Sequence, residues 1–385
     1  MSGGPHGSRP IRRPPEPPGF RLGAALRRLL PLASIVVLVL TTGATLAVAG
    51  STLGYDFLAY HAAAARVLAG LPAYDTSFEA AGGFGLFYYP PTFIPLVLPL
   101  GLLPAAAATW SWIALLLASF VAGVASMPVG ARTRWLVLLL AGMSWPFLYA
   151  VKLGQVGPLL FLAFAVGWRS LDRPAVLGLA GALGAAVKMQ PGLVLAWALL
   201  TRRWAAVAAG AAVLALLAVA ATVVAGFGAW SDFLLLVGRV SDPITTPRNF
   251  TPGAVAFQLG MTREAASLVQ WAAMGAVALA FVYAALRRPP VVSYLVAVVA
   301  SQLLSPILWD HYALLLLLPV GWLLDRGRTW AVLIPLATCV ALVGLIPPIV
   351  YPLAFGVTLV ALLAEPAWAG DARARPPREA LPSAP

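Results

Sequence analysis

Long runs of apolar residues dominate the chain between residues 29 and 364, and short polar segments separate them. The first run, 29–50, holds an apolar core of about 20 residues, which is long enough to cross a bilayer as a helix. Further runs lie near 90–103, 105–127, 135–150, 156–168, 174–187, 189–200, 204–226, 265–286, 291–308, 312–324, 329–346 and 349–364. This pattern predicts an all-α fold, a polytopic bundle of transmembrane helices.

Two of these runs need separate treatment. The first ends in Ala47-Val48-Ala49, which resembles a signal-peptidase site, but its core is longer than that of a signal peptide. We therefore expect a retained first span. The run at 90–103 contains four prolines, Pro90, Pro91, Pro95 and Pro99, which favour a re-entrant, non-spanning segment. The expected total is about 12 spans in a domain over 29–364, between disordered tails at 1–28 and 365–385.

Composition excludes a soluble protein, because only 10% of the residues are charged and 61% are hydrophobic. Soluble domains carry about 25% charged residues. The net charge of +12 does not indicate a nucleic-acid partner, since the arginines fall in pairs between hydrophobic runs, as topology determinants do. The resulting topology places 19 of the 25 Lys and Arg inside, with both termini cytoplasmic. The single cysteine, Cys339, excludes a disulfide framework and a thiolate metal site.

The first long outer loop, 51–87, contains an alanine-rich stretch that stops at Gly70-Leu71-Pro72 and predicts a helix over 56–69. Asp56 lies near the start of this helix, where the helix dipole favours a carboxylate. Tyr60 follows one turn later on the same face. The alternative is that Asp56 only caps the helix. In the same loop, Asp75 and Glu79 are expected to order the chain.

Other polar residues cluster at outer helix ends. They are Lys152, Gln155, Lys188, Gln190, Asp310 and His311, together with Arg248 in the second long outer loop, 227–263. The chain has only two lysines, and both lie on the side that the positive-inside rule disfavours. Ionisable residues at membrane depth are candidates for function, although each lysine could instead snorkel to the interface. The many Trp and Tyr residues are interpreted as interface anchors.

If Asp56, Lys188, Arg248 and His311 converge, they suit transfer of a group from a lipid-linked phosphate donor. A carboxylate takes the proton of an attacking hydroxyl, and cations stabilise the charge on the departing phosphate. A transporter or flippase of a lipid-linked sugar could place the same residues along a pathway. The sequence carries no Walker motif, no Gly-x-Ser-x-Gly and no paired His or Cys spacing for a metal.

Motifs spread over residues 53–325 resemble glycosyltransferase family 87 of the GT-C superfamily. The resemblance rests on the order and spacing of Gly54-Tyr55-Asp56-Phe57 with Tyr60, Gly70-x-Pro72-x-Tyr74-Asp75, Phe87-x-Tyr89-Pro90-Pro91, Pro99-Leu100-x-Leu102-Leu103-Pro104, Gly154-Gln155, Lys188, Arg202-Arg203-Trp204, Leu304-Ser305-Pro306 and Asp310-His311-Tyr312. The chain departs from the family pattern at Val156, where Asn is common, and at Met189, where Pro is common.

The resemblance implies an inverting GT-C glycosyltransferase in the plasma membrane, with its active site extracytoplasmic. The expected donor is a polyprenyl-phosphate sugar, with mannose first among the sugars, and the acceptor is a lipid-linked or glycan hydroxyl. Asp56 matches the catalytic aspartate of the family and His311 a histidine that contacts the donor phosphate. Gln155 and Lys188 match polar positions near the site, and Asp310, Tyr60 and Arg248 complete the candidate set. No cofactor or metal is expected, since the first motif carries a single acidic residue.

Overall fold

The computed structural model describes residues 24–77, 85–239 and 242–366. Within these residues the secondary structure is helical, with one isolated bridge between Ser144 and Cys339. Glu79 and most of the predicted tails lie outside the described residues. The first helix already begins at Ala24, and Glu365 pairs with Arg328. The helices are α1 (Ala24–Ala47), α2 (Tyr55–Leu68), α3 (Ile94–Val97), α4 (Ala105–Ser126), α5 (Ala131–Met143), α6 (Trp145–Leu153), α7 (Gly157–Arg169), α8 (Pro174–Val187), α9 (Leu193–Leu200), α10 (Trp204–Ala225), α11 (Gly228–Arg239), α12 (Pro252–Gln258), α13 (Arg263–Arg287), α14 (Pro290–Leu303), α15 (Leu317–Asp325), α16 (Leu333–Leu336) and α17 (Val350–Ala364).

Among the described residues, four helices are long and apolar enough to cross a membrane: α1 from Arg28 onward, α4, α10 and α13. The pair α6 and α7 would make a fifth, bent by 117° at a short break. The other apolar helices are shorter, so the predicted total of about 12 spans stays a prediction. The set of apolar helices fits a multi-pass membrane protein, as the composition indicated.

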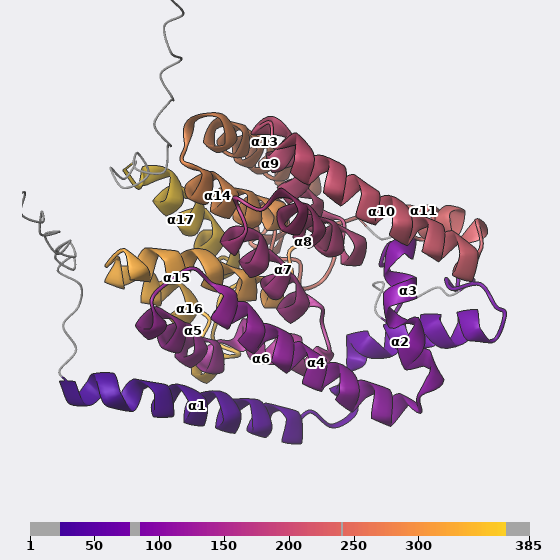
Figure 1. Ribbon diagram of the computed structural model, residues 1–385, viewed down its shortest axis with the longest axis horizontal. Helices are drawn as coiled ribbons and strands as arrows, with labels where there is room; N and C mark the ends of the chain where they lie inside the picture. Colours follow the sequence, from indigo (N-terminus) through magenta and orange to yellow (C-terminus); the bar gives the residue numbers. More distant parts are fainter. Residues whose placement is uncertain (1–23, 78–84, 240–241, 367–385) are drawn as a thin grey trace, which may run out of the picture.

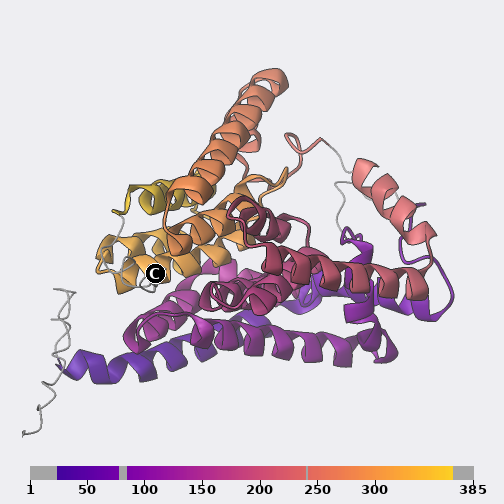
Figure 2. The same ribbon diagram turned by 45° about the horizontal axis from the view of Figure 1, so that its top comes forward.

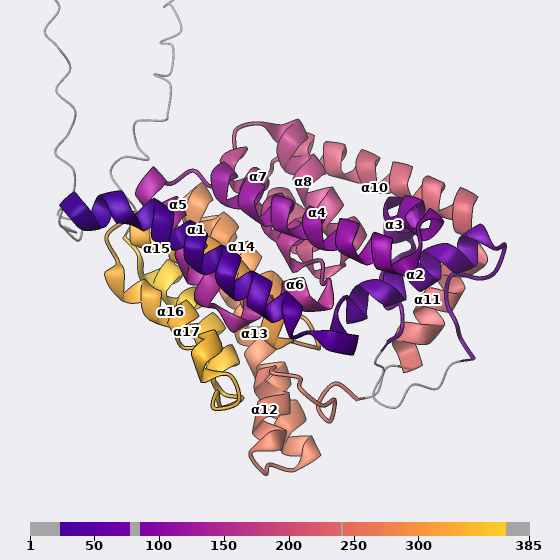
Figure 3. The ribbon, with the colours of Figure 1, turned by 90° about the horizontal axis from the view of Figure 1, so that it is seen from below.

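The long helices surround a packed centre. In Figure 1, α1 runs along one edge of the molecule beneath α5 and α6, and Figure 3 shows it crossing the same helices from below. Figure 2 shows α13 projecting away from the rest of the bundle. Few residues of α1, α10 and α13 are buried, as expected for helices that face lipid, whereas α14 is buried along nearly its whole length.

Glycines allow the closest helix contacts. A Cβ on Gly178 in α8 would lie 2.3 Å from the carbonyl oxygen of Ala206 in α10. A Cβ on Gly142 in α5 would lie 2.9 Å from the backbone of Leu38 in α1. Small residues at such crossings are typical of helix packing in membranes, where close backbone approach supplies the contact energy.

Several apolar runs are broken rather than continuous. The 90–103 segment forms two 3₁₀ turns (Pro91–Phe93 and Leu98–Leu102) on either side of the short helix α3, and its non-spanning character stays a prediction. The 329–346 run, expected as one helix, forms the turns Thr329–Val332 and Val340–Leu342 on either side of α16. Pro335 lies inside α16 and Pro347 and Pro348 follow the last turn, and proline donates no backbone hydrogen bond to prolong a helix.

Candidate active site

Asp56 lies in the first turn of α2, at the end of a tight entry loop. Gly54 has φ +68°, and its N–H donates to the carbonyl of Lys152 at 2.8 Å. A Cβ on Gly54 would lie 2.6 Å from Cγ2 of Thr109 in α4, so a larger residue would displace this loop. The loop therefore fixes the start of α2 against α4 and the end of α6, and with it the position of Asp56.

Gln155 lies in the break between α6 and α7 and contacts Asp56 directly. Its Nε2 donates to Oδ2 of Asp56 at 2.5 Å. The preceding Gly154 ends α6 with φ +70°, and a Cβ there would lie 2.6 Å from Cβ of Phe57. Trp112 secures the same turn by donating its indole N–H to the Gly154 carbonyl at 2.7 Å. Two left-handed glycines thus bring together residues that are 99 positions apart in the sequence.

A chain of tyrosines orients the Gln155 amide. The Tyr89 hydroxyl donates to Oε1 of Gln155 at 3.0 Å, and the Tyr60 hydroxyl donates to that of Tyr89 at 2.6 Å. The Tyr74 hydroxyl donates to the Tyr89 carbonyl at 2.7 Å. Burial raises the pKa of the Tyr60 and Tyr89 hydroxyls, so both remain donors at neutral pH. Because Oε1 of Gln155 is occupied, its amide nitrogen faces the carboxylate.

The Asp56 carboxylate is half-buried, and no backbone N–H of the described residues donates to it. The simple capping role considered from the sequence therefore has no supporting hydrogen bond. Burial raises the pKa of the Asp56 carboxyl, while the charges of His311 and Lys188 and the hydrogen bond from Gln155 partly offset this rise. A carboxylate with a raised pKa is a better general base near neutral pH.

Lys188 follows the end of α8, just before the 3₁₀ turn Gln190–Gly192 that leads into α9. Its Nζ lies 4.1 Å from the centroid of the Tyr312 ring and 5.7 Å from that of Tyr89. Burial lowers the pKa of this ammonium to about 7, although the nearby charge of Asp56 acts in the opposite direction. Lys188 is therefore held against aromatic rings beside the carboxylate rather than extended toward an interface.

His311 and Asp310 begin a 3₁₀ turn (Asp310–Leu316), and each is only 4% exposed. Asp310 accepts hydrogen bonds from the Trp145 indole at 3.3 Å and from the His311 backbone N–H at 2.8 Å. Nδ1 of His311 lies 3.5 Å from Oδ1 of Asp310, yet neither ring nitrogen makes a hydrogen bond with a described residue. A buried polar group without a partner is costly, and such a group indicates a place for a ligand.

Arg248 joins this cluster through Tyr149. Its guanidinium donates to the Tyr149 hydroxyl at 3.4 Å, and Lys152 lies over the same ring at 5.6 Å from the centroid. The Tyr149 ring centroid is 6.1 Å from that of His311. The neighbouring Asn249 holds the 227–263 loop against the segment before Asp310, because its side-chain amide donates to the Pro306 carbonyl at 3.1 Å. The arginine is exposed and can reach a ligand at the edge of the cluster.

Each predicted site residue therefore has a defined place. Asp56, Tyr60 and Gln155 belong to one hydrogen-bond network. Lys188 and His311 lie close enough to Asp56 to influence the pKa of its carboxyl. Asp310 accepts a hydrogen bond from Trp145, and Arg248 donates one to Tyr149. The sequence interpretation quoted Tyr89 only as part of a family motif and assigned none of Tyr89, Trp145 and Tyr149 to the site, because tyrosine and tryptophan were interpreted as interface anchors. The spacing of Tyr149 three residues before Lys152 on one helix was the available signal.

The part of the chain that the structure describes brings together no group of three or more His, Cys, Asp or Glu side chains suited to a metal ion. The expectation of a metal-independent reaction stays a prediction.

Comparison with protein-family models matches residues 87–306, more than half of the chain, to glycosyltransferase family 87. The chain belongs to glycosyltransferase family 87. Family 87 membership makes it a glycosyltransferase with sugar donor and acceptor substrates. No curated protein and no solved structure matches the chain.

The family 87 match includes Tyr89, Gln155, Lys188 and Arg248 but excludes Asp56 and the Asp310-His311 pair. The structure joins these flanking residues to the matched region. Asp56 accepts a hydrogen bond from Gln155, and Asp310 accepts one from Trp145; both donors lie in the matched region. The cluster of polar side chains around Asp56 and Asp310 thus draws on the matched region and on both of its flanks.

Proposed function

We propose that this glycosyltransferase moves a hexose, mannose first among the candidates, from a polyprenyl-phosphate sugar to a hydroxyl of a lipid-linked or glycan acceptor. In this proposal the reaction takes place at the extracytoplasmic face of the plasma membrane, with both chain termini in the cytoplasm. The observation that carries it is the half-buried carboxylate of Asp56, which accepts a hydrogen bond from Gln155 and lies near the side chains of Lys188 and His311. The proposed base, Asp56, therefore lies next to the side chains proposed to stabilise the leaving phosphate.

In the proposed step, an acceptor oxygen attacks the anomeric carbon of the donor from the face opposite the phosphate. The bond between the anomeric carbon and the phosphate oxygen breaks, and the anomeric configuration inverts. The acceptor proton passes to the Asp56 carboxylate. The bonding electrons leave with the polyprenyl phosphate, which gains one negative charge.

The cations suit that leaving group. Lys188 lies beside Asp56, the unpartnered ring nitrogens of His311 are available to donate, and Arg248 approaches from its loop. Preorganised donors aimed at developing charge commonly supply the largest share of catalysis. Gln155 and the tyrosines behind it restrict the carboxylate to one orientation, which reduces the entropy lost on reaching the reactive geometry.

The alternative from another class is a flippase of a lipid-linked sugar. Family membership favours the enzyme. The contacts of Asp56 also favour it. A carboxylate held by Gln155 next to Lys188 and His311 suits proton transfer at one place better than a series of sites along a transport pathway.

The donor class is tested with the purified full-length protein in detergent. Radiolabelled polyprenyl-phosphate mannose, polyprenyl-phosphate glucose and a nucleotide-linked mannose are offered in parallel with a crude lipid acceptor extract. We expect label to enter a new glycolipid only from a polyprenyl-phosphate donor. Transfer from the nucleotide sugar would contradict the donor class, and movement of the donor across vesicles without glycosidic product would favour the flippase.

A further inference from the structure

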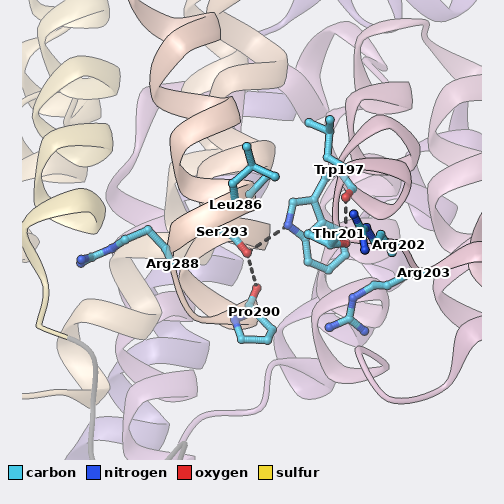
Figure 4. Close-up of a pocket in the computed structure, with 10 residues that line it drawn as sticks. Trp197, Thr201, Arg202, Arg203, Leu286, Arg288, Pro290 and Ser293 are labelled. Carbon is cyan, nitrogen blue, oxygen red and sulfur yellow. Dashed lines mark hydrogen bonds between the residues drawn. The ribbon is translucent and has the colours of Figure 1, made fainter.

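A polar cavity lies away from Asp56, where the turn between α9 and α10 meets the turn between α13 and α14. Its volume is about 370 Å³, and its lining includes Trp197, Thr201, Arg202, Arg203, Arg288 and Ser293 (Figure 4). None of the described residues that line it is acidic. The cavity thus combines arginines and hydroxyl groups with the apolar side chains of Leu200 and Leu286.

Arg202 holds an unusual backbone conformation at the rim of this cavity. Helix α9 ends with Arg203 N–H donating to the Ala198 carbonyl at 2.8 Å and Arg202 N–H to the Leu199 carbonyl at 3.0 Å. This pairing requires a left-handed residue, which is usually glycine, and Arg202 adopts it with φ +57°. A non-glycine residue is strained in this conformation. The exposed Arg202 guanidinium makes no hydrogen bond or ion pair with any described residue.

The other walls of the cavity are fixed by contacts. The guanidinium of Arg203 lies 4.9 Å from the Trp197 ring and donates to the Leu171 carbonyl. The Trp197 indole donates to the Ser293 hydroxyl at 3.0 Å (Figure 4). Burial lowers the pKa of Arg203, which the carboxylate of Asp172 partly offsets. The positive charges of the arginines that line the cavity therefore outnumber the nearby negative charge of Asp172, and contacts hold the cavity walls in place.

Arg288 contributes differently from the other two arginines. Figure 4 shows its side chain turned away from Trp197, and its guanidinium donates to the Glu365 carbonyl. The charges available to a ligand are therefore those of Arg202 and Arg203.

The position of the cavity separates it from the candidate active site. Helix α14 begins at Pro290, which lines the cavity, and ends at Leu303, shortly before Asp310 and His311. Its 14 residues correspond to about 21 Å at 1.5 Å per residue. The cavity and the Asp56 cluster therefore occupy opposite ends of the bundle. In the predicted topology, the cavity is at the cytoplasmic end.

The helices beside the cavity present apolar surface to their surroundings. Both α10 and α13 are long enough to span a membrane, and few of their residues are buried. Trp204 and Leu286, at the ends of these helices nearest the cavity, are exposed. Acyl chains can lie along such surfaces, and basic cavities between transmembrane helices favour anionic headgroups.

We propose that this cavity binds the phosphate headgroup of an anionic membrane phospholipid, with its acyl chains along α10 and α13. Arg202 and Arg203 pair with the phosphate, while Thr201 and the Trp197 indole edge form the wall behind it. This proposal is independent of the proposed sugar transfer, because it concerns other residues at the other end of the molecule.

The test is lipid retention by the full-length protein in detergent, measured by native mass spectrometry with phosphatidylglycerol or phosphatidylcholine. We expect phosphatidylglycerol to be retained in preference. Arg202→Gln should weaken its retention about fivefold, corresponding to about 1 kcal/mol for one cation near a headgroup. Arg287→Gln is the matched control, because Arg287 is exposed on the adjacent turn and does not line the cavity. It should leave retention at the wild-type level.

Arg202→Gly separates folding from binding. Glycine suits the left-handed position, so this variant should keep or raise the melting temperature while losing phosphatidylglycerol to the same extent as Arg202→Gln. Wild-type retention in Arg202→Gly would overturn the proposal. So would equal retention of the two lipids, equal losses in the Arg202 and Arg287 variants, or displacement of the lipid by millimolar inorganic phosphate, which would assign the cavity to a free anion.

Discussion

The two ends of the bundle both hold a cation against an aromatic ring, but they differ in the polar side chains that accompany it. At the first, Lys188 lies 4.1 Å from the Tyr312 ring centroid, and at the second Arg203 lies 4.9 Å from that of Trp197. The first end adds the Asp56 carboxylate, held by Gln155, and the unpartnered ring of His311. The second has no acidic residue among its described lining. Cations alone suit the binding of an anion. A carboxylate beside them can also accept a proton from an attacking hydroxyl, which suits a reaction in which a phosphate leaves.

Among changes that leave Asp56 in place, His311→Ala should have the largest effect. It removes a buried donor from the expected position of the leaving phosphate, and the loss of one such donor lowers the rate by about a hundredfold or more. Steady-state kinetics with varied donor would show the loss in kcat/KM. If the donor kinetics were unchanged, His311 would not contact the donor phosphate. The first end would then differ less from the second than we propose.

Gln155→Leu should have the next largest effect. The substitution removes the hydrogen bond to Asp56, and hydrogen bonds to charged groups contribute about 2 kcal/mol, so we expect kcat to fall about thirtyfold. Donor affinity should remain near that of the wild type, because Gln155 positions the base. A fall in affinity with kcat preserved would instead assign Gln155 to donor binding.

Lys188→Arg should change the pH dependence. The Lys188 ammonium has a pKa of about 7, so its charge is present below pH 7 and lost as the pH rises through that value. The groups around it are Asp56, Tyr89 and Tyr312. We expect an alkaline limb near pH 7 in kcat/KM, so that activity at pH 8 is about a tenth of its plateau. Arginine stays charged, and this limb should move upward in the variant. A limb that remains near pH 7 would belong to another group.

Tyr89→Phe should have the smallest effect. It removes the donor that orients the Gln155 amide but keeps the aromatic packing, and a neutral hydrogen bond contributes about 1 kcal/mol. We expect kcat to fall about fivefold, and the melting temperature should fall as well, because the buried Tyr60 hydroxyl loses its acceptor. Combined with Gln155→Leu, it should add almost nothing, because both act through the orientation of Asp56. If the two substitutions instead lowered kcat independently and additively, Tyr89 and Gln155 would not act through one hydrogen-bonded chain to Asp56.

The sequence predicted local features of the molecule better than its long-range contacts. The helix expected at 56–69 is Tyr55–Leu68, because an alanine-rich stretch followed by Gly-Leu-Pro fixes both ends locally. The expected run at 291–308 stops at Leu303, and the 329–346 run is broken. Hydropathy reports that a residue avoids water, and it does not distinguish a buried turn from a helix.

The same limit applies to the site. Asp56, Lys188 and His311 stood out because charge is rare in this chain, and rarity is a local property of the sequence. The contact between Asp56 and Gln155 depends on the left-handed turns at Gly54 and Gly154 and could not be derived from spacing. Tyr89 was overlooked because its apolar ring matches an interface anchor, whereas its buried hydroxyl hydrogen-bonds to Gln155.

The central claim is that Asp56 is the base of sugar transfer, and Asp56→Asn tests it most directly. The variant is measured for single-turnover transfer and for binding of polyprenyl-phosphate mannose, with Glu264→Gln, an exposed acidic residue at the start of α13, as the control. We predict that Asp56→Asn abolishes transfer while it stays folded and binds donor nearly as well as the wild type, and that Glu264→Gln is fully active. Normal turnover by Asp56→Asn would contradict the account.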